Sequence, residues 1–336
     1  MIRVPLFQVL RMSKSYWFYF LTVVVVGILT AAIGALALTF TGASGCFSPR
    51  HERGAFVAYC ATAALADYEH GAFYYGLERE AIANLKSADV IILGNSRAQA
   101  AFSTGALRDF FATRGIKYFL LGFGYGELSD LPLYLMKRNS VRPKVLVINA
   151  NPFFQTFNTQ PMAEIAKGAR IRYLLKKGAL ELIATVCPLH PEICNSPVAM
   201  IYRSVLNGEW VWLNTSNAER ALPFEFNESP FENEKAIDQW ARTGVEFFKE
   251  FPIQRHCVVL TGVPAPGLSA GRIATSLAGR LGTELINVTV NDMTTMDQAH
   301  LSKETAERWS QAFLARLDPV LNECGLRGRQ PQHTSM

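Results

Sequence analysis

The sequence predicts an α/β fold in which a parallel sheet is covered by helices on both faces. From residue 89 onward, short and continuously apolar segments alternate with helical patterns, beginning with DVIIL at 89–93. Strands without polar alternation are typical of sheets buried on both sides, and strand–helix alternation favours parallel pairing. Hydrophobic residues make up 49% of the 336 residues, which is enough for a substantial core.

Five strands and four helices are expected in this body. The predicted strands are 89–93, 117–121, 144–150, 256–264 and 282–288, and the predicted helices are 103–115, 128–139, 232–251 and 302–317. Ser103 or Thr104, Ser129 and Ser302 precede three of the helices and suit their N-caps, and Gly115 directly follows the first helix.

The segment 16–40 is predicted to cross a membrane as a helix. No Asp, Glu, Lys or Arg occurs between Lys14 and Arg50, and 25 helical residues rise about 37 Å. Arg3, Arg11 and Lys14 precede the segment, which favours a cytoplasmic N-terminus and an exported body. The apolar segment is longer than the hydrophobic region of an ordinary secretory signal, which has about 7–15 residues, so an uncleaved anchor is favoured, although the small residues at 35–45 could offer a cleavage site.

The chain is expected to divide at this anchor. We predict a cytoplasmic N-terminus (1–15), the anchor (16–40), a partly helical connector (41–84), the α/β body (85–320) with an irregular insertion (153–232), and a tail (321–336). The net charge of +5 comes without any dense basic tract, which argues against nucleic-acid binding.

All six cysteines follow the anchor, an arrangement typical of disulfides in an exported domain. Cys187 with Cys194 is the favoured pair, and Cys46 with Cys60 is the second. Cys257 lies in an apolar strand, where it could simply be a small buried residue. The short loop between Cys187 and Cys194 matches no common zinc spacing, so no metal is expected.

Polar residues at the ends of the predicted strands form a candidate catalytic site. Ser96 follows the first strand within LGNSR, at the edge where parallel sheets bind ligands. Asp297 and His300 stand three residues apart before the last helix. A carboxylate can orient a histidine, which can then remove a serine proton. Taken singly, Ser96 also suits a turn and His300 a solvated position.

Four segments in order, ILGNSR, LLGFGYGELSD, VINANPFF and DQAHLS, resemble the motif blocks of the GDSL/SGNH hydrolase superfamily. The resemblance covers about 85–318 and implies a flavodoxin-like three-layer α/β/α domain. It implies Ser96 as nucleophile, His300 as general base and acid, and Asp297 as the residue that orients His300.

The resemblance also implies an oxyanion hole. Its donors would be the N–H of Ser96, the side chain of Asn151, and the N–H of a glycine after the second strand. Gly124 is slightly favoured over Gly126 for that last position. No cofactor is implied, and no G-x-G-x-x-G follows the first strand.

The sequence departs from the family pattern in three blocks, and two of the departures keep a second hypothesis open. Asn95 replaces the usual Asp before the serine, which is tolerable because that position is not a triad member. Pro152 follows Asn151 in place of an Asp, and the second block lacks its frequent Asn; these two changes keep the alternative open. The alternative is a catalytically inactive, membrane-anchored scaffold or polysaccharide-binding subunit of an export complex. Arg97 is interpreted as an ion-pair or rim residue.

The anchor and LGNSR resemble one exported branch of the superfamily, which includes alginate O-acetyltransferases and the D-alanine transfer protein of teichoic acid synthesis. This resemblance implies a bacterial inner-membrane protein with a periplasmic or extracytoplasmic domain. It implies a carbohydrate or glycolipid substrate and partner proteins for export or acyl donation. The expected activity is an esterase if water attacks the acyl-enzyme, and an O-acyltransferase if a sugar hydroxyl does. Aromatic residues of 153–232, including Trp210 and Trp212, suit either a core or a sugar-stacking surface.

Overall fold

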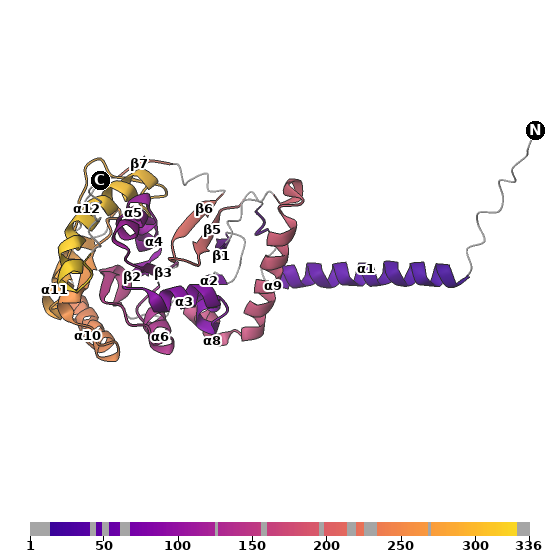
Figure 1. Ribbon diagram of the computed structural model, residues 1–336, viewed down its shortest axis with the longest axis horizontal. Coiled ribbons are helices and arrows are strands. Elements are labelled where there is room, and N and C mark those ends of the chain that lie inside the picture. Colours follow the sequence, from indigo (N-terminus) through magenta and orange to yellow (C-terminus); the bar gives the residue numbers. More distant parts are fainter. Residues whose placement is uncertain are drawn as a thin grey trace, which may run out of the picture.

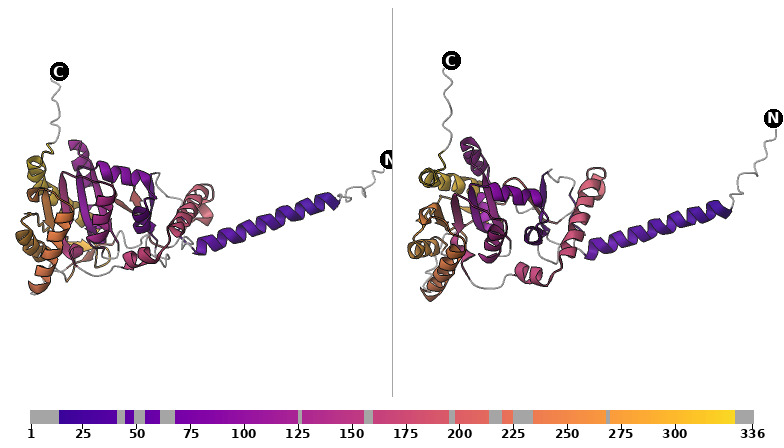
Figure 2. Two further views of the ribbon diagram at one scale, coloured as in Figure 1. Left: turned by 90° about the horizontal axis from the view of Figure 1, so that it is seen from below. Right: turned by 60° about the horizontal axis from the view of Figure 1, so that its bottom comes forward.

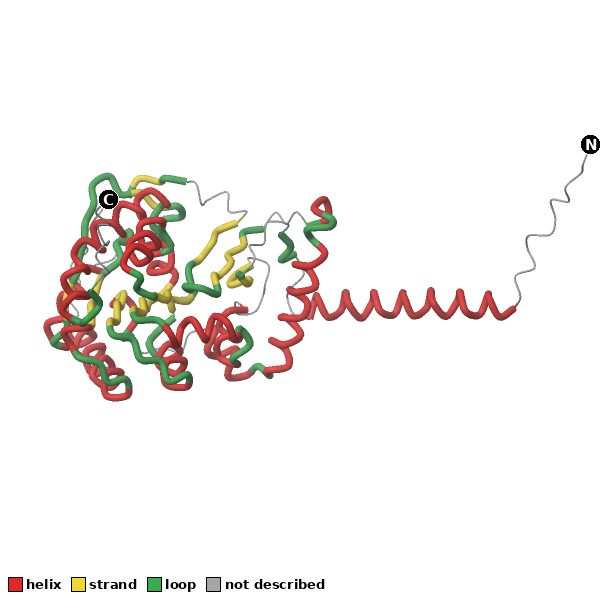
Figure 3. The backbone as a smooth tube through the Cα atoms, in the orientation of Figure 1, coloured by secondary structure: helices red, strands yellow, loops and turns green. Residues whose placement is uncertain are grey.

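The computed structural model describes an α/β body and one long helix, α1 (Lys14–Phe40), that projects from it (Figure 1). The described residues are 14–40, 45–48, 54–60, 68–124, 127–155, 160–194, 198–213, 220–224, 234–267 and 270–327. Figure 3 shows helices surrounding the strands of the body.

The body is built on a five-stranded parallel sheet. Its order is β3 (Tyr118–Phe123), β2 (Val90–Asn95), β4 (Val145–Asn149), β8 (Val258–Thr261) and β9 (Glu284–Leu285). Every residue of β2, β3, β4 and β8 is buried, as expected for continuously apolar strands. The mixed α/β class with a parallel sheet is confirmed.

Alternate strand residues enter two separate cores. Ile91 and Leu93 of β2 pack toward the core of α6 (Asp130–Arg138), α10 (Glu234–Glu250) and α11 (Ala270–Leu281). Val90 and Ile92 pack toward the core of α4 (Ser96–Phe102), α5 (Gly105–Arg114) and α12 (Lys303–Glu323). Helices therefore cover both faces of the sheet, as Figure 2 shows from two further directions.

Helix ends follow local sequence signals closely. Thr104 accepts a hydrogen bond from the Leu107 N–H at the start of α5, and Gly115 ends that helix at φ 64°. Ser302 caps α12 in the same way, through the Thr305 N–H. Ser129 precedes α6 but makes no side-chain cap bond.

A second, three-stranded antiparallel sheet pairs the segment after α1 with the segment 200–213, a pairing that the sequence did not predict. Its order is β1 (Ala55–Cys60), β5 (Met200–Ser204) and β6 (Trp210–Leu213). The segment 41–84, expected as a connector, therefore supplies β1, α2 (Tyr68–Tyr75) and most of α3 (Arg79–Ser87) to the folded body.

The expectation that 153–232 is irregular is wrong. This stretch contains α8 (Gln160–Lys167), α9 (Arg170–Val186), β5, β6 and β7 (Leu222–Pro223). The remaining short elements are α7 (Ala150–Phe153), β10 (Thr294–Thr295) and the 3₁₀ turns Pro191–Ile193 and Arg255–Cys257. The short strands escaped detection because β1 and β5 pair across about 140 residues, and no local periodicity reports such a partner.

A buried ion pair attaches the second sheet to the first. Arg203 of β5 lies 2.6 Å from Glu69 of α2, and both side chains are fully buried. The Arg203 guanidinium also donates to the carbonyl oxygens of Leu120 and Gly122 in β3. Because Arg203 serves β3 and α2 together, it fixes the second sheet against the edge of the parallel sheet.

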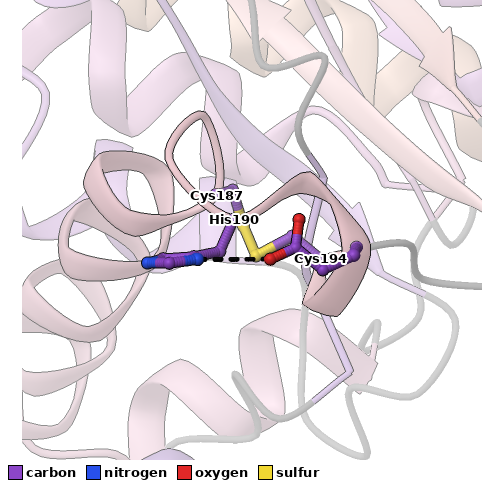
Figure 4. Close-up of a disulfide and its surroundings, with 4 residues drawn as sticks. Cys187, His190 and Cys194 are labelled. Carbon is purple, nitrogen blue, oxygen red and sulfur yellow. Dashed lines mark hydrogen bonds and ion pairs between the residues drawn. A yellow bond between two sulfur atoms is a disulfide. The ribbon is translucent and has the colours of Figure 1, made fainter.

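Three disulfides form, and no described cysteine is free. Cys187 bonds Cys194 (Figure 4) and Cys46 bonds Cys60, which are the two pairs that the sequence favoured. Cys257 bonds Cys324, so its interpretation as a lone buried residue is wrong. The third pair joins residues 67 positions apart, a separation that gives no signal in the sequence.

Helix α1 is long and apolar enough to cross a membrane. Its apolar stretch, Tyr16–Leu36, has a mean hydropathy of 2.3, and none of it is buried against the described chain. Arg3 and Arg11, which favoured a cytoplasmic N-terminus, lie outside the described residues.

Candidate functional site

Ser96 stands where β2 passes directly into α4. A Cβ on Gly94 would lie 2.7 Å from the Cβ of Ala98 and 2.9 Å from that of Asn149, so only glycine permits this close approach. The Asn95 side chain accepts a hydrogen bond from the Arg97 N–H (3.1 Å) and caps α4. LGNSR is therefore a tight turn that holds Ser96 at the carboxyl edge of the sheet.

Ser96, His300 and Asp297 form a continuous hydrogen-bonded chain. The Nε2 atom of His300 lies 2.8 Å from the Oγ of Ser96, and its Nδ1 lies 2.8 Å from Oδ2 of Asp297. The other oxygen of Asp297 accepts the N–H groups of Ala299 (3.0 Å) and His300 (2.9 Å). Ser96 and His300, 204 positions apart in the chain, thus meet at hydrogen-bonding distance, and with Asp297 they have the order of a nucleophile, a base and an orienting carboxylate.

The electrostatics suit proton removal from Ser96. Partial burial raises the pKa of Asp297, but the hydrogen bonds and charge of His300 and the N–H of Ala299 outweigh it and lower this pKa to about 2. Asp297 is therefore ionised at neutral pH. A carboxylate beside Nδ1 favours the tautomer that carries its proton there, which leaves the Nε2 lone pair facing the Ser96 hydroxyl.

The sequence-predicted oxyanion residues follow the two strands that flank β2. Gly124 is buried and directly follows β3, in which Phe123 pairs with Asn95. Asn151 is buried two residues after β4, and its carboxamide nitrogen donates to none of the described residues. The N–H of Ser96 begins α4 and lacks an intrahelical acceptor. Gly126 lies outside the described residues.

Sequence reasoning missed Asn149, which joins three strand ends. Its amide nitrogen donates to Oδ1 of Asn95 (3.3 Å) and to the carbonyl of Asn151 (3.2 Å), and its oxygen accepts from the Val263 N–H (3.1 Å). The only signal in the sequence that could have indicated Asn149 is the pair of asparagines in VINANP, where the family resemblance points only to Asn151. Asn149 positions both the Ser96 turn and the Asn151 segment.

Two further side chains border the triad. The ring of Trp212, at the end of β6, lies 5.9 Å from the ring of His300 and is half-buried. Arg97 is half-buried beside Ser96; burial lowers the pKa of its guanidinium, and the charge of Asp297 partly offsets this. Arg97 makes no ion pair with any residue that the structure describes, contrary to the ion-pair interpretation.

Two other groups of polar side chains lack the residues that a metal site or a second triad would need. His256 lies near Cys257 and Cys324, but both sulfurs are in a disulfide and offer no thiolate to a metal. A cavity of about 150 Å³ between α9 and β1 contains Glu78, which accepts hydrogen bonds from Tyr68 (2.7 Å) and Lys177 (2.8 Å). Its described lining contains no histidine.

The chain was also compared with known proteins. No family model matches it, and neither a curated protein nor a solved structure gives a match. The functional conclusion therefore depends on the geometry of the site.

Proposed function

We propose that this protein is a membrane-anchored serine esterase or O-acyltransferase of the SGNH type. The single observation that carries the proposal is the Ser96–His300–Asp297 chain, with both joining distances at 2.8 Å. The strand order β3-β2-β4-β8-β9 also suits it, because the same order occurs in flavodoxin-like sheets, which bind ligands at the carboxyl ends of the strands.

In the proposed mechanism, Ser96 Oγ attacks an acyl carbonyl while His300 Nε2 takes its proton. The N–H groups of Ser96 and Gly124 and the amide of Asn151 stabilise the oxyanion, and a lost donor of this kind costs about 2.7–4 kcal/mol. His300 then returns the proton to the leaving oxygen. Water or a sugar hydroxyl, deprotonated by His300, then attacks the acyl carbonyl; the bond to Ser96 Oγ breaks, and His300 gives its proton back to Oγ, which restores the enzyme.

An envelope polysaccharide or glycoconjugate is the proposed substrate class. Trp212 presents an aromatic surface next to His300, which suits the apolar face of a sugar ring. The three disulfides all follow α1, which supports an oxidising, extracytoplasmic location for the body. The cytoplasmic membrane of a bacterium fits this arrangement.

The test is covalent labelling of the full chain in detergent with a fluorophosphonate, read by intact mass. We expect one adduct on the parent protein and none on Ser96→Ala. We expect His300→Ala to slow labelling by about 10²- to 10⁴-fold, the usual contribution of a general base.

Matched controls exist in the same chain. Ser276 is a half-buried helical serine, and His190 forms an exposed pair with Glu192 (3.2 Å) that contains no serine. Ser276→Ala and His190→Ala should label at the parent rate. A folded parent that gains no adduct would contradict the proposal and favour the inactive scaffold.

A further inference from the structure

Helix α9 has two apolar faces, and only one of them packs on the body. Tyr173 packs into the core of the body, and Ile183, on the same side of the helix, is buried with Cys187 and Cys194. On the opposite side, four large apolar side chains are exposed by 41–62%: Ile171, Leu174, Leu175 and Leu182. At 100° per residue, these four positions fall within an arc of about 100°. A continuous apolar stripe of this kind marks an interaction surface.

The position of α9 relative to α1 indicates that this stripe lies at the surface of the bilayer that α1 would cross. Leu38 of α1 packs against the buried cluster that contains Ile183 and Cys187. The apolar stretch of α1 ends at Leu36, two residues or about 3 Å earlier along the helix axis. If α1 spans a bilayer, α9 therefore lies at the level where the hydrocarbon core gives way to the headgroups.

The orientation of α9 agrees with that level. In Figures 1 and 2, α9 runs across the direction of α1 and lies between α1 and the α/β body. The stripe is opposite the face that packs on the body, so it is directed away from the body, and α1 also extends away from the body in these views. A helix in this orientation lies in the plane of the membrane that α1 crosses.

The polar residues near the start of α9 suit an anionic surface. Lys167, Arg170 and Arg172 lie within six residues of one another, and the side chains of Lys167 and Arg170 are exposed. Leu189, in the loop closed by the Cys187–Cys194 disulfide, adds an apolar side chain that is 72% exposed just beyond the helix end. Apolar and basic residues together are typical of interfacial helices.

We propose that α9 is an interfacial helix that docks on the bilayer crossed by α1, with Ile171, Leu174, Leu175 and Leu182 directed toward the acyl chains. The anchor and α9 then hold the body at two points and fix its orientation on the membrane. This inference uses the span of α1 and is independent of the chemistry at Ser96.

The test places nitroxide spin labels on the full chain in nanodiscs of phosphatidylcholine and phosphatidylglycerol. Because no described cysteine is free, single substitutions Leu174→Cys and Leu182→Cys provide specific labelling sites. Power-saturation measurements then compare relaxation by oxygen, which concentrates in the bilayer, with relaxation by a water-soluble nickel complex. We expect oxygen-to-nickel ratios severalfold above the aqueous value at both sites.

Leu206→Cys is the matched aqueous control, because Leu206 is a leucine in the β5–β6 turn and is 66% exposed. Val25→Cys, in the middle of α1, is the bilayer control. Each labelled variant is accepted once its thermal unfolding matches that of the parent. The proposal fails if the labels at 174 and 182 behave like the label at 206. It also fails if both reagents are excluded there, because that result would indicate cover by protein, such as a second copy of the chain.

Discussion

At the scale of single residues, His300 is held from both sides. Its backbone N–H and its Nδ1 both meet Asp297, and its Nε2 meets Ser96. Asp297 is in turn fixed by the Ala299 N–H. The imidazole therefore has one orientation, and that orientation depends on a single carboxylate.

Replacing this carboxylate tests the dependence. In Asp297→Asn, the amide no longer favours the proton on Nδ1, and we expect fluorophosphonate labelling of Ser96 to fall by roughly 10⁴-fold, by analogy with serine proteases. Asp292→Asn is the control, because Asp292 is an exposed aspartate five residues earlier. Equal labelling rates in the two variants would show that Asp297 does not orient His300.

The same variant has a predicted pH signature in stability. The pKa of Asp297 is lowered from 3.8 to about 2, so the ionised carboxylate stabilises the folded state above about pH 4. That stabilisation is lost as pH falls from about 4 to about 2. We expect Asp297→Asn to flatten this part of the parent's curve of unfolding free energy against pH, measured by urea denaturation, whereas Asp292→Asn should not.

At the scale of elements, the junction between β2 and α4 requires a residue without a side chain at position 94. The β2 strand ends so close to α4 and β4 that a methyl group on Gly94 would overlap both Ala98 and Asn149. The φ of Gly94 is also positive, at 156°. Backbone and packing therefore exclude a larger residue at this position.

We expect Gly94→Ala to lower the free energy of unfolding by about 1–3 kcal/mol, as overpacking in a core usually does. The shift it forces in α4 should also slow labelling of Ser96. Gly279→Ala is the matched control, because Gly279 is exposed in α11 and a Cβ there meets nothing within 4 Å. This control should be neutral or stabilising by up to about 1 kcal/mol. Urea unfolding midpoints that coincide for the two variants would contradict the close packing.

At the scale of the whole molecule, the two sheets are joined through charge as well as apolar contact. Arg203 reaches from β5 to Glu69 of α2 and to two carbonyls of β3, and the indole N–H of Trp210 also donates to Glu69 (3.3 Å). Because β3 leads directly to Gly124, this cluster also supports one side of the candidate oxyanion hole.

We expect Arg203→Met to cost about 3–5 kcal/mol in unfolding free energy, because it leaves Glu69 buried without its counter-charge. Adding Glu69→Leu should restore part of that loss, so the double variant is more stable than the sum of the single effects predicts. Arg280→Met, which removes a surface arginine paired with Asp238 (3.0 Å), should change stability little. Strict additivity in the cycle would show that Arg203 and Glu69 are not coupled.

Local signals in the sequence were sufficient to predict the parallel sheet and to place Ser96 at the end of its first strand. Strands β2, β3 and β4 are continuously apolar, Thr104 and Ser302 cap their helices, and Ser96 follows directly on β2. These features depend on residues within a few positions of one another, which is the range that periodicity and capping patterns report.

The features of the fold and the site that the sequence did not predict depend on residues far apart in the chain. The pairing of β1 with β5, the Cys257–Cys324 disulfide and the contact of Trp212 with His300 all join segments more than 60 residues apart. Asn149 was missed for a different reason, since its role appears only when β2, β4 and β8 lie side by side. Burial of a charged pair such as Arg203 and Glu69 also runs against any composition-based expectation.

The Cys46–Cys60 bond has a consequence for proteolysis. A protease that cuts anywhere between these two cysteines leaves the fragments covalently joined, with α1 still attached to the body through sulfur. Separating α1 from the body by such a cut requires a reductant as well as a protease, whereas a single cut between Phe40 and Cys46 breaks the covalent link without a reductant. Separation of the fragments by a reductant after proteolysis therefore reveals on which side of Cys46 the chain was cut.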